Sequence, residues 1–121
     1  MSKILTIDDS RMMRQMLMMA LSDAGHTVVQ ASDGVEGLEQ LKAAGAVDVI
    51  ITDINMPRLD GFGFIQQARA IVLHRATPIL VLSTETGDDK KARARAAGAS
   101  GWIVKPFNAE KLLSAVRRVA G

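Results

Sequence analysis

The amino-acid sequence predicts an α/β fold in which helices cover both faces of an open, parallel, five-stranded sheet. Five short apolar runs alternate with five longer segments whose apolar residues recur at the three-to-four spacing of an amphipathic helix. Only short links join these segments, so right-handed parallel crossovers follow and give a three-layer α/β/α sandwich. A closed eight-fold barrel would need about 200 residues or more, and the chain has 121.

The five expected strands are rich in β-branched residues or leucine and are bounded by turn residues. Runs that are apolar throughout are typical of strands buried on both faces of a parallel sheet. In chain order the expected strands are Ile4–Ile7, Val28–Val29, Val47–Ile51, Ile79–Leu82 and Trp102–Val104.

Capping residues and glycines set the limits of the expected helices. Short polar side chains suited to a helix N-cap precede most of them, and glycines close three. The helices are expected from Ser10 to Gly25, from Ser32-Asp33 to Gly45, from Asp60 to Val72, from Asp88 to Gly98 and from Asn108 to Ala120.

Composition restricts the class of protein further. Nearly half of the residues (48%) are apolar and 23% are charged, which suits one folded domain over residues 1–121. The absence of cysteine excludes disulfides, zinc–thiolate sites, iron–sulfur clusters and thiol chemistry. No apolar run approaches the roughly 18 residues that span a bilayer, and no secretory signal precedes the first strand. We therefore expect a cytoplasmic protein without membrane contact.

The charge pattern does not favour nucleic-acid binding. Fifteen basic and thirteen acidic residues leave a net charge of +2, and three phenylalanines and one tryptophan offer no array for stacking bases. The basic run Lys90–Arg95 alternates with alanine, and an Asp89–Arg93 pair four residues apart explains it as a solvated helix face. A partner surface is the alternative interpretation.

Chemically active side chains follow four of the expected strands. In an open parallel sheet, sites lie beyond the carboxyl ends of the strands. Taken alone, Asp8 or Asp9 would be interpreted as a cap of the first helix. Taken as a set, the strand ends are expected to bring three carboxylates, a hydroxyl and a lysine to one edge of the sheet. The strand ends carry Asp8-Asp9, Asp53, Ser83-Thr84 and Lys105-Pro106, and the second strand ends in Ser32-Asp33, which adds little.

Gathering three carboxylates requires a compensating cation. At about 4 Å and an effective dielectric constant near 20, each like-charged pair costs on the order of 4 kcal/mol. Lys105 neutralises one charge, and a hard divalent ion fits the remainder because the other ligands are oxygens. The sequence therefore predicts Mg²⁺, with Mn²⁺ as a substitute, at Asp8, Asp9 and Asp53.

Such a site suits phosphoryl transfer. The metal and Lys105 would hold two phosphoryl oxygens, and Ser83 would donate a hydrogen bond to a third. Asp53 follows the central strand, and aspartate is a known covalent nucleophile. The residues by themselves therefore favour an aspartyl phosphate formed on Asp53.

Four stretches resemble the response-regulator receiver family, most closely its single-domain chemotaxis members. They are Ile7–Ser10, Asp53–Gly61, Val81–Glu85 and Gly98–Phe107, in the same order and at the same strand ends, and the resemblance covers essentially the whole chain. It implies a flavodoxin-like (βα)5 sandwich with the strand order 2-1-3-4-5.

The resemblance also implies a role for each site residue. Asp53 would accept the phosphoryl group from a phosphohistidine of a sensor kinase. Asp9 would bind magnesium directly and Asp8 through water, with the main-chain carbonyl of Asn55 completing the protein ligands. Lys105 would contact the phosphoryl group, and its bond to Pro106 is expected to be cis.

Conformational and kinetic roles follow from the same resemblance. Ser83 would move when the phosphoryl group arrives, and Trp102 would turn inward as the aromatic switch. The best-known chemotaxis members carry tyrosine at this position, so a readout that needs its hydroxyl does not apply here. A half-buried ring covering the sheet edge is the alternative for Trp102. Asn55 and Glu85 would tune the lifetime of the aspartyl phosphate, or are simply solvated loop residues.

The two histidines and the seven methionines have simpler interpretations. His26 and His74 lie in expected loop or helix-end positions and are predicted to be surface residues. The methionines concentrate between Met12 and Met19, where we expect them to serve the core and an adaptable surface.

The implied function is that of a chemotaxis switch which binds its target through the fourth helix, fifth strand and fifth helix, including Lys90, Lys91, Trp102 and Ile103. Its partners would be a chemotaxis histidine kinase, the flagellar motor switch protein and a phosphatase, with the switch itself a monomer. The chain ends at Gly121 after the last helix, so no DNA-binding module is expected.

Alternative functions remain open at this point. A phosphate sink or relay receiver without motor output fits the same motifs. An aspartate-nucleophile phosphatase would carry Asp-x-Asp at the end of its first strand, where this chain has adjacent Asp8-Asp9. Nucleotide binding is weaker still, because the chain has no GxxxxGK[ST] loop.

Overall fold

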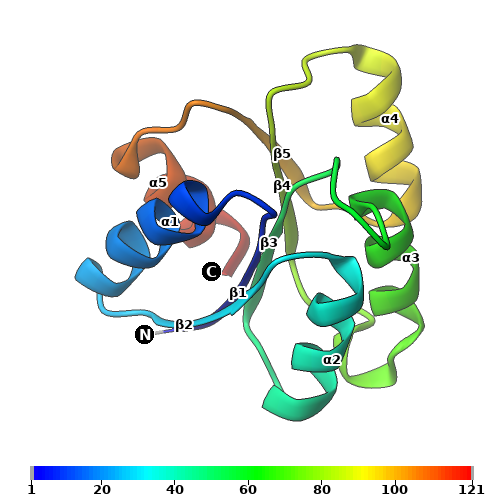
Figure 1. The fold of residues 1–121 in the computed structure, drawn as a ribbon, viewed down its shortest axis with the longest axis horizontal. Helices are drawn as coiled ribbons and strands as arrows, with labels where there is room; N and C mark the ends of the chain where they lie inside the picture. Colours follow the sequence, from blue (N-terminus) through cyan, green and yellow to red (C-terminus); the bar gives the residue numbers. More distant parts are fainter. Residues whose placement is uncertain (1, 121) are drawn as a thin grey trace.

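The structure, a computed structural model, describes residues 2–120 (Figure 1). Met1 and Gly121, on which the expectations about the chain ends rest, lie outside the described residues. Strands and helices alternate along the chain. In order they are β1 (Lys3–Ile7), α1 (Arg11–Asp23), β2 (Thr27–Ala31), α2 (Gly34–Ala44), β3 (Val49–Thr52), α3 (Gly61–Ala70), a 3₁₀ turn (Val72–His74), β4 (Ile79–Ser83), α4 (Asp88–Ala97), β5 (Gly101–Val104) and α5 (Ala109–Ala120).

The five strands form one parallel sheet in the order β2-β1-β3-β4-β5. Helices α1 and α5 cover one face, and α2, α3 and α4 cover the other (Figure 1). This arrangement confirms the predicted α/β/α sandwich and the flavodoxin-like strand order. Consecutive parallel strands on one sheet need crossover helices, which is why each strand is followed by a helix.

The core consists of two apolar layers, one on each side of the sheet. Leu17 and Leu21 of α1 meet Leu112 and Val116 of α5 on the first side. Strands β1, β3 and β4 are buried almost throughout, as predicted, because helices cover both of their faces. The prediction was wrong for β2 and β5, which are largely half-exposed because each lies at an edge of the sheet.

Side-chain caps begin α1, α2, α3 and α5 where the sequence predicted them. The side chains of Ser10, Asp33 and Asp60 accept main-chain N–H groups of their own helices. Asn108 accepts the N–H of Lys111 in the same way, over 2.7 Å. Gly98 closes α4 with a φ of +118°, a left-handed conformation that favours glycine.

Element limits differ from the prediction by a few residues. Helix α3 ends at Ala70, and the apolar run that follows it turns into the 3₁₀ segment. Strand β3 begins at Val49, two residues after the start of its apolar run. Within residues 2–120, no helix has the length and hydropathy that crossing a bilayer would need.

His74 corrects a prediction, because it is fully buried rather than on the surface. Its Nδ1 lies 3.1 Å from Oγ1 of Thr77, and its main-chain oxygen accepts a hydrogen bond from Arg69. His26 is partly buried, and its Nδ1 accepts the N–H of Ser2. A polar residue in a short turn gives no sequence signal of burial when, as here, distant segments cover it.

Candidate functional site

The carboxyl ends of β1, β3, β4 and β5 lie at one edge of the sheet and deliver the predicted site residues. Main-chain hydrogen bonds continue the strand pairing into these residues. The N–H of Asp53 donates to the oxygen of Ile7 at 2.9 Å, and the N–H of Lys105 donates to the oxygen of Ser83 at 2.8 Å. The backbone positions of these residues are therefore set by the sheet itself.

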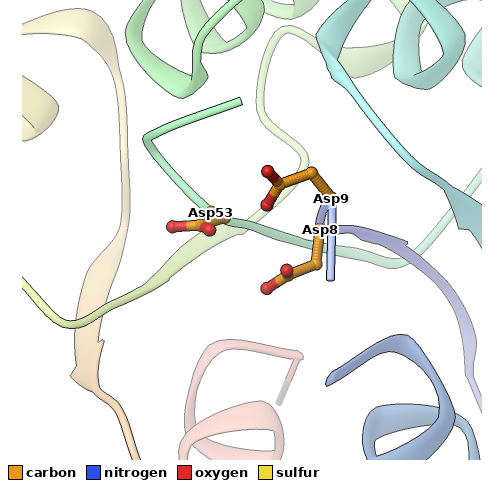
Figure 2. A group of neighbouring side chains, drawn as sticks. All are labelled: Asp8, Asp9 and Asp53. Carbon is orange, nitrogen blue, oxygen red and sulfur yellow. The ribbon is translucent and has the colours of Figure 1, made fainter. Parts of the chain in front are cut away.

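Asp8, Asp9 and Asp53 form a cluster in which one carboxylate oxygen from each lies within 4.8 Å of the others. Figure 2 shows Asp8 and Asp9 leaving the end of β1 beside Asp53, which follows β3. Asp8 is 1% exposed and Asp53 is 8% exposed, whereas Asp9 lies on the open side. Ser10 caps α1, and Oδ1 of Asp8 accepts only the local N–H of Ser10, so helix capping does not explain the cluster.

Lys105 lies against the two buried carboxylates. Its Nζ is 2.8 Å from Oδ2 of Asp8 and 3.2 Å from Oδ2 of Asp53. Burial alone would lower the pKa of Lys105, but the hydrogen bonds and charges of Asp8 and Asp53 outweigh it and raise that pKa. Lys105 is therefore a cation at neutral pH. The bond from Lys105 to Pro106 is cis, as the family resemblance implied.

Asp53 is held in an environment that opposes its charge. Burial raises the pKa of its carboxyl group, and the charge of Asp8 adds to that effect. The N–H of Ile54, which donates to Oδ1 at 2.7 Å, and the charge of Lys105 lower the pKa in part. The carboxylate is thus oriented from one side by the backbone and from the other by the lysine.

Ser83 and Trp102 are connected through Glu85. The N–H of Glu85 donates to Oγ of the fully buried Ser83 at 3.1 Å. The indole N–H of Trp102 donates to the main-chain oxygen of Glu85 at 3.0 Å. Trp102 is half-buried against the core beneath α2, α3 and α4. The side chain of Glu85 lies 3.4 Å from Lys90 at the start of α4, and Asn55 is exposed in the loop after β3.

The sequence analysis missed the role of Asp33, which it regarded as a minor strand-end residue. Asp33 is buried and caps α2, and it also forms a two-point ion pair with Arg58 in the β3–α3 loop. The carboxylate of Asp33 was visible in the sequence as a helix cap. Its pairing with a residue 25 positions away had no signal there.

The donor set fits magnesium. The cluster offers oxygen ligands alone, and three carboxylates beside one lysine leave an excess of negative charge. Mg²⁺ is a hard cation that takes one or two carboxylates together with water and phosphate oxygens. Asp9 and Asp53 can supply two such carboxylates at an edge that is open through Asp9, and Asp8 lies near enough to act through water.

The amino-acid sequence is similar to proteins of known class. The model of the response regulator receiver domain matches residues 4–117. The chain is 37% identical to chemotaxis protein CheY1 of Helicobacter pylori, over 98% of this chain and 97% of that protein. It is 36% identical to a CheY homolog of Campylobacter jejuni, over 98% and 92%.

Solved structures give the same result. CheY4 of Vibrio cholerae superposes with a TM-score of 0.94 at 47% identity, covering 98% of both chains. A receiver domain from Clostridium thermocellum superposes with a TM-score of 0.90 at 29% identity, over 99% of this chain and 94% of that one. Because these similarities extend over nearly the full length of each protein, the chain belongs to the response regulator receiver family and is a receiver of the CheY type.

Proposed function

We propose that the chain is a chemotaxis switch that accepts a phosphoryl group on Asp53 from a phosphohistidine of its histidine kinase. The observation that carries the proposal is Lys105, which bridges the buried carboxylates of Asp8 and Asp53 beside a third carboxylate. A lysine and an oxygen-rich cation site on either side of one aspartate suit the charge of a phosphoryl group in transfer.

In the proposed reaction, a carboxylate oxygen of Asp53 attacks phosphorus. The bond between phosphorus and the imidazole nitrogen breaks, and its electron pair stays on that nitrogen. The N–H of Ile54 orients the carboxylate, and Lys105 lies close enough to contact an incoming phosphoryl oxygen. Mg²⁺, held by Asp8, Asp9, Asp53 and the main-chain oxygen of Asn55, would supply charge neutralisation when bound.

Ser83 is suited to detect the phosphoryl group. Its Oγ accepts the N–H of Glu85, which leaves the hydroxyl proton free to donate to a phosphoryl oxygen. A shift of Ser83 toward Asp53 would also move Glu85, which is hydrogen-bonded to it. The main-chain oxygen of Glu85 accepts the indole N–H of Trp102, so the ring would be affected in turn. Asn55 and Glu85 flank the path of a hydrolysing water in this proposal, and so set the lifetime of the aspartyl phosphate.

The proposed output surface is formed by α4, β5 and α5. A groove of about 600 Å³ there combines apolar and basic side chains, among them Ile103, Phe107, Lys111 and Arg118. Trp102 of β5 also lines this groove. Lys90 and Lys91 add basic side chains on α4. This chemistry supports a protein partner, and we assign the flagellar motor switch protein to it, with a phosphatase as a second partner of a monomeric, cytoplasmic receiver. A phosphate sink without motor output is the alternative.

The proposal is tested by intact mass after incubation with Mg²⁺ and a small phosphodonor, with Asp53→Asn as the control. We expect one phosphoryl adduct that requires both the metal and Asp53. An adduct that persists in Asp53→Asn, or that forms equally with chelator, would contradict the proposed chemistry. Binding of the phosphorylated protein to motor-switch peptides then separates a motor switch from a phosphate sink.

A further inference from the structure

We propose that the ion pair between Arg58 and Asp33 is a positioning element of the metal site, because it fixes the loop that carries Asn55. This inference rests on the proposed function, in which the main-chain oxygen of Asn55 is a ligand. A main-chain ligand has no rotamer of its own, so its position depends entirely on the path of the backbone. Mg²⁺ tolerates little departure from octahedral geometry.

The ion pair has the geometry of a rigid fork. Nε of Arg58 lies 2.9 Å from Oδ2 of Asp33, and Nη2 lies 3.1 Å from Oδ1. Two parallel contacts fix orientation as well as distance, which a single lysine contact does not do. The Arg58 guanidinium, together with the N–H groups of α2, holds the pKa of Asp33 below its usual value, so the pair is charged at neutral pH.

The backbone at Arg58 needs such support. Arg58 has a φ of +68°, a left-handed conformation that is unfavourable for a residue with a side chain. The N–H of Leu59 donates to the oxygen of Pro57 at 2.8 Å, which closes a three-residue turn around Arg58. Strained turns of this kind persist where surrounding contacts hold them.

A second contact holds the loop beside the same helix end. The N–H of Gly34 donates to the oxygen of Leu59 at 3.2 Å. A Cβ atom at Gly34 would lie 2.5 Å from that oxygen, so only glycine allows the approach. The first turn of α2 therefore contacts the loop through Asp33 and through Gly34.

Helix α2 in turn packs on β1, the strand that Asp8 and Asp9 follow. A Cβ atom at Gly37 would lie 2.6 Å from Cδ1 of Ile7, the last residue of β1. Asp8 and Asp9 follow directly. The Arg58–Asp33 pair thus connects the loop that carries Asp53 and Asn55 to helix α2. That helix packs against β1, the strand that Asp8 and Asp9 follow.

Two single variants distinguish positioning from charge. Arg58→Met removes a cation near the site, so an effect of charge alone would strengthen Mg²⁺ binding. Asp33→Asn removes an anion, so charge alone would weaken it, while asparagine still suits the N-cap. If the pair acts by positioning, both variants weaken binding.

We expect each variant to lower the Mg²⁺ affinity about tenfold, the lower end of the loss seen when support outside the ligand shell is removed. The double variant should lose little more than either single one, because both act on the same contact. Arg58→Gly, which relieves the backbone strain as it removes the pair, should also bind weakly. Isothermal titration with Mg²⁺ and with Mn²⁺ measures these affinities, and urea unfolding establishes that each variant is folded.

Arg117→Met, which removes an exposed arginine on α5, is the matched control and should bind Mg²⁺ as the unmodified chain does. Opposite shifts in Arg58→Met and Asp33→Asn, or unchanged affinity in both, would overturn the inference while the proposed metal site stands. Absence of Mg²⁺ binding to the unmodified chain would instead overturn the proposed function, and the inference with it.

Discussion

The indole N–H of Trp102 donates a hydrogen bond to the main-chain oxygen of Glu85 over 3.0 Å. This contact attaches the aromatic ring of β5 to the β4–α4 loop. The main-chain N–H of Glu85 in turn donates to Oγ of Ser83. Ser83, Glu85 and Trp102 therefore form a continuous path of hydrogen bonds from the sheet edge to the half-buried ring. Tryptophan lacks the hydroxyl that tyrosine would carry at this position, but its indole N–H is likewise a hydrogen-bond donor.

Ser83→Ala should separate phosphoryl uptake from the response of Trp102. Removal of Oγ breaks the first hydrogen bond of this path and leaves the N–H of Glu85 without that acceptor. We expect the variant to gain the phosphoryl mass on incubation with Mg²⁺ and a phosphodonor. It should lose the change in Trp102 fluorescence that an inward turn of the ring would produce in the unmodified chain. Trp102 is the single tryptophan of the chain, so the fluorescence signal is unambiguous.

Ser83→Thr, which keeps the hydroxyl, should retain the fluorescence change, and the exposed Ser22→Ala on α1 is a control for loss of a serine elsewhere. A full change in Ser83→Ala would show that Trp102 responds through another path.

Lys105→Met should strengthen Mg²⁺ binding and weaken the metal-free fold. The ammonium group contacts Oδ2 of both Asp8 and Asp53, and so competes with a cation for the same oxygens. One unit charge at about 4 Å is worth on the order of 4 kcal/mol at a dielectric constant of 20, so even a third of it gives about a tenfold gain in affinity. Without metal, the two buried carboxylates lose their lysine partner, and the free energy of unfolding should fall by about 3 kcal/mol.

Isothermal titration and urea unfolding, each with and without Mg²⁺, measure both effects. Lys42→Met on the exposed side of α2 provides the matched loss of a lysine. Unchanged Mg²⁺ affinity in Lys105→Met would mean that the cation does not bind at the oxygens that the lysine contacts.

The sheet and its edge were predictable from the sequence because local and global signals agree there. Apolar runs at β1, β3 and β4 are buried on both sides, and the polar residues Asp8, Asp53 and Ser83 stand at their carboxyl ends. The caps Ser10 and Asp60 were also local, since each side chain bonds within its own helix. Periodicity and capping therefore sufficed to place Asp8, Asp53 and Lys105 together.

Features that depend on distant contacts were not predictable. Arg58 and Asp33 are 25 residues apart, and neither has a pattern that names the other. His74 follows two exposed apolar residues, Val72 and Leu73, yet is itself fully buried. In both cases tertiary packing, not local sequence, decides the environment of the side chain.

His74 should make the stability of the fold depend on pH below neutrality. Burial lowers the pKa of this imidazole below the ordinary 6.5, and the nearby charge of Arg69 acts in the same direction. The unfolded chain therefore takes up a proton at a higher pH than the folded one. The resulting stability is complete above pH 6.5 and is lost as the pH falls from 6.5 toward the lower folded pKa.

Urea unfolding of the unmodified chain and of His74→Gln, at intervals between pH 7.5 and about 5, measures this dependence. We expect the free energy of unfolding of the unmodified chain to fall more steeply than that of His74→Gln, which stays neutral throughout. Parallel slopes for the unmodified chain and His74→Gln would show that the buried imidazole takes up its proton equally readily in the folded and unfolded states.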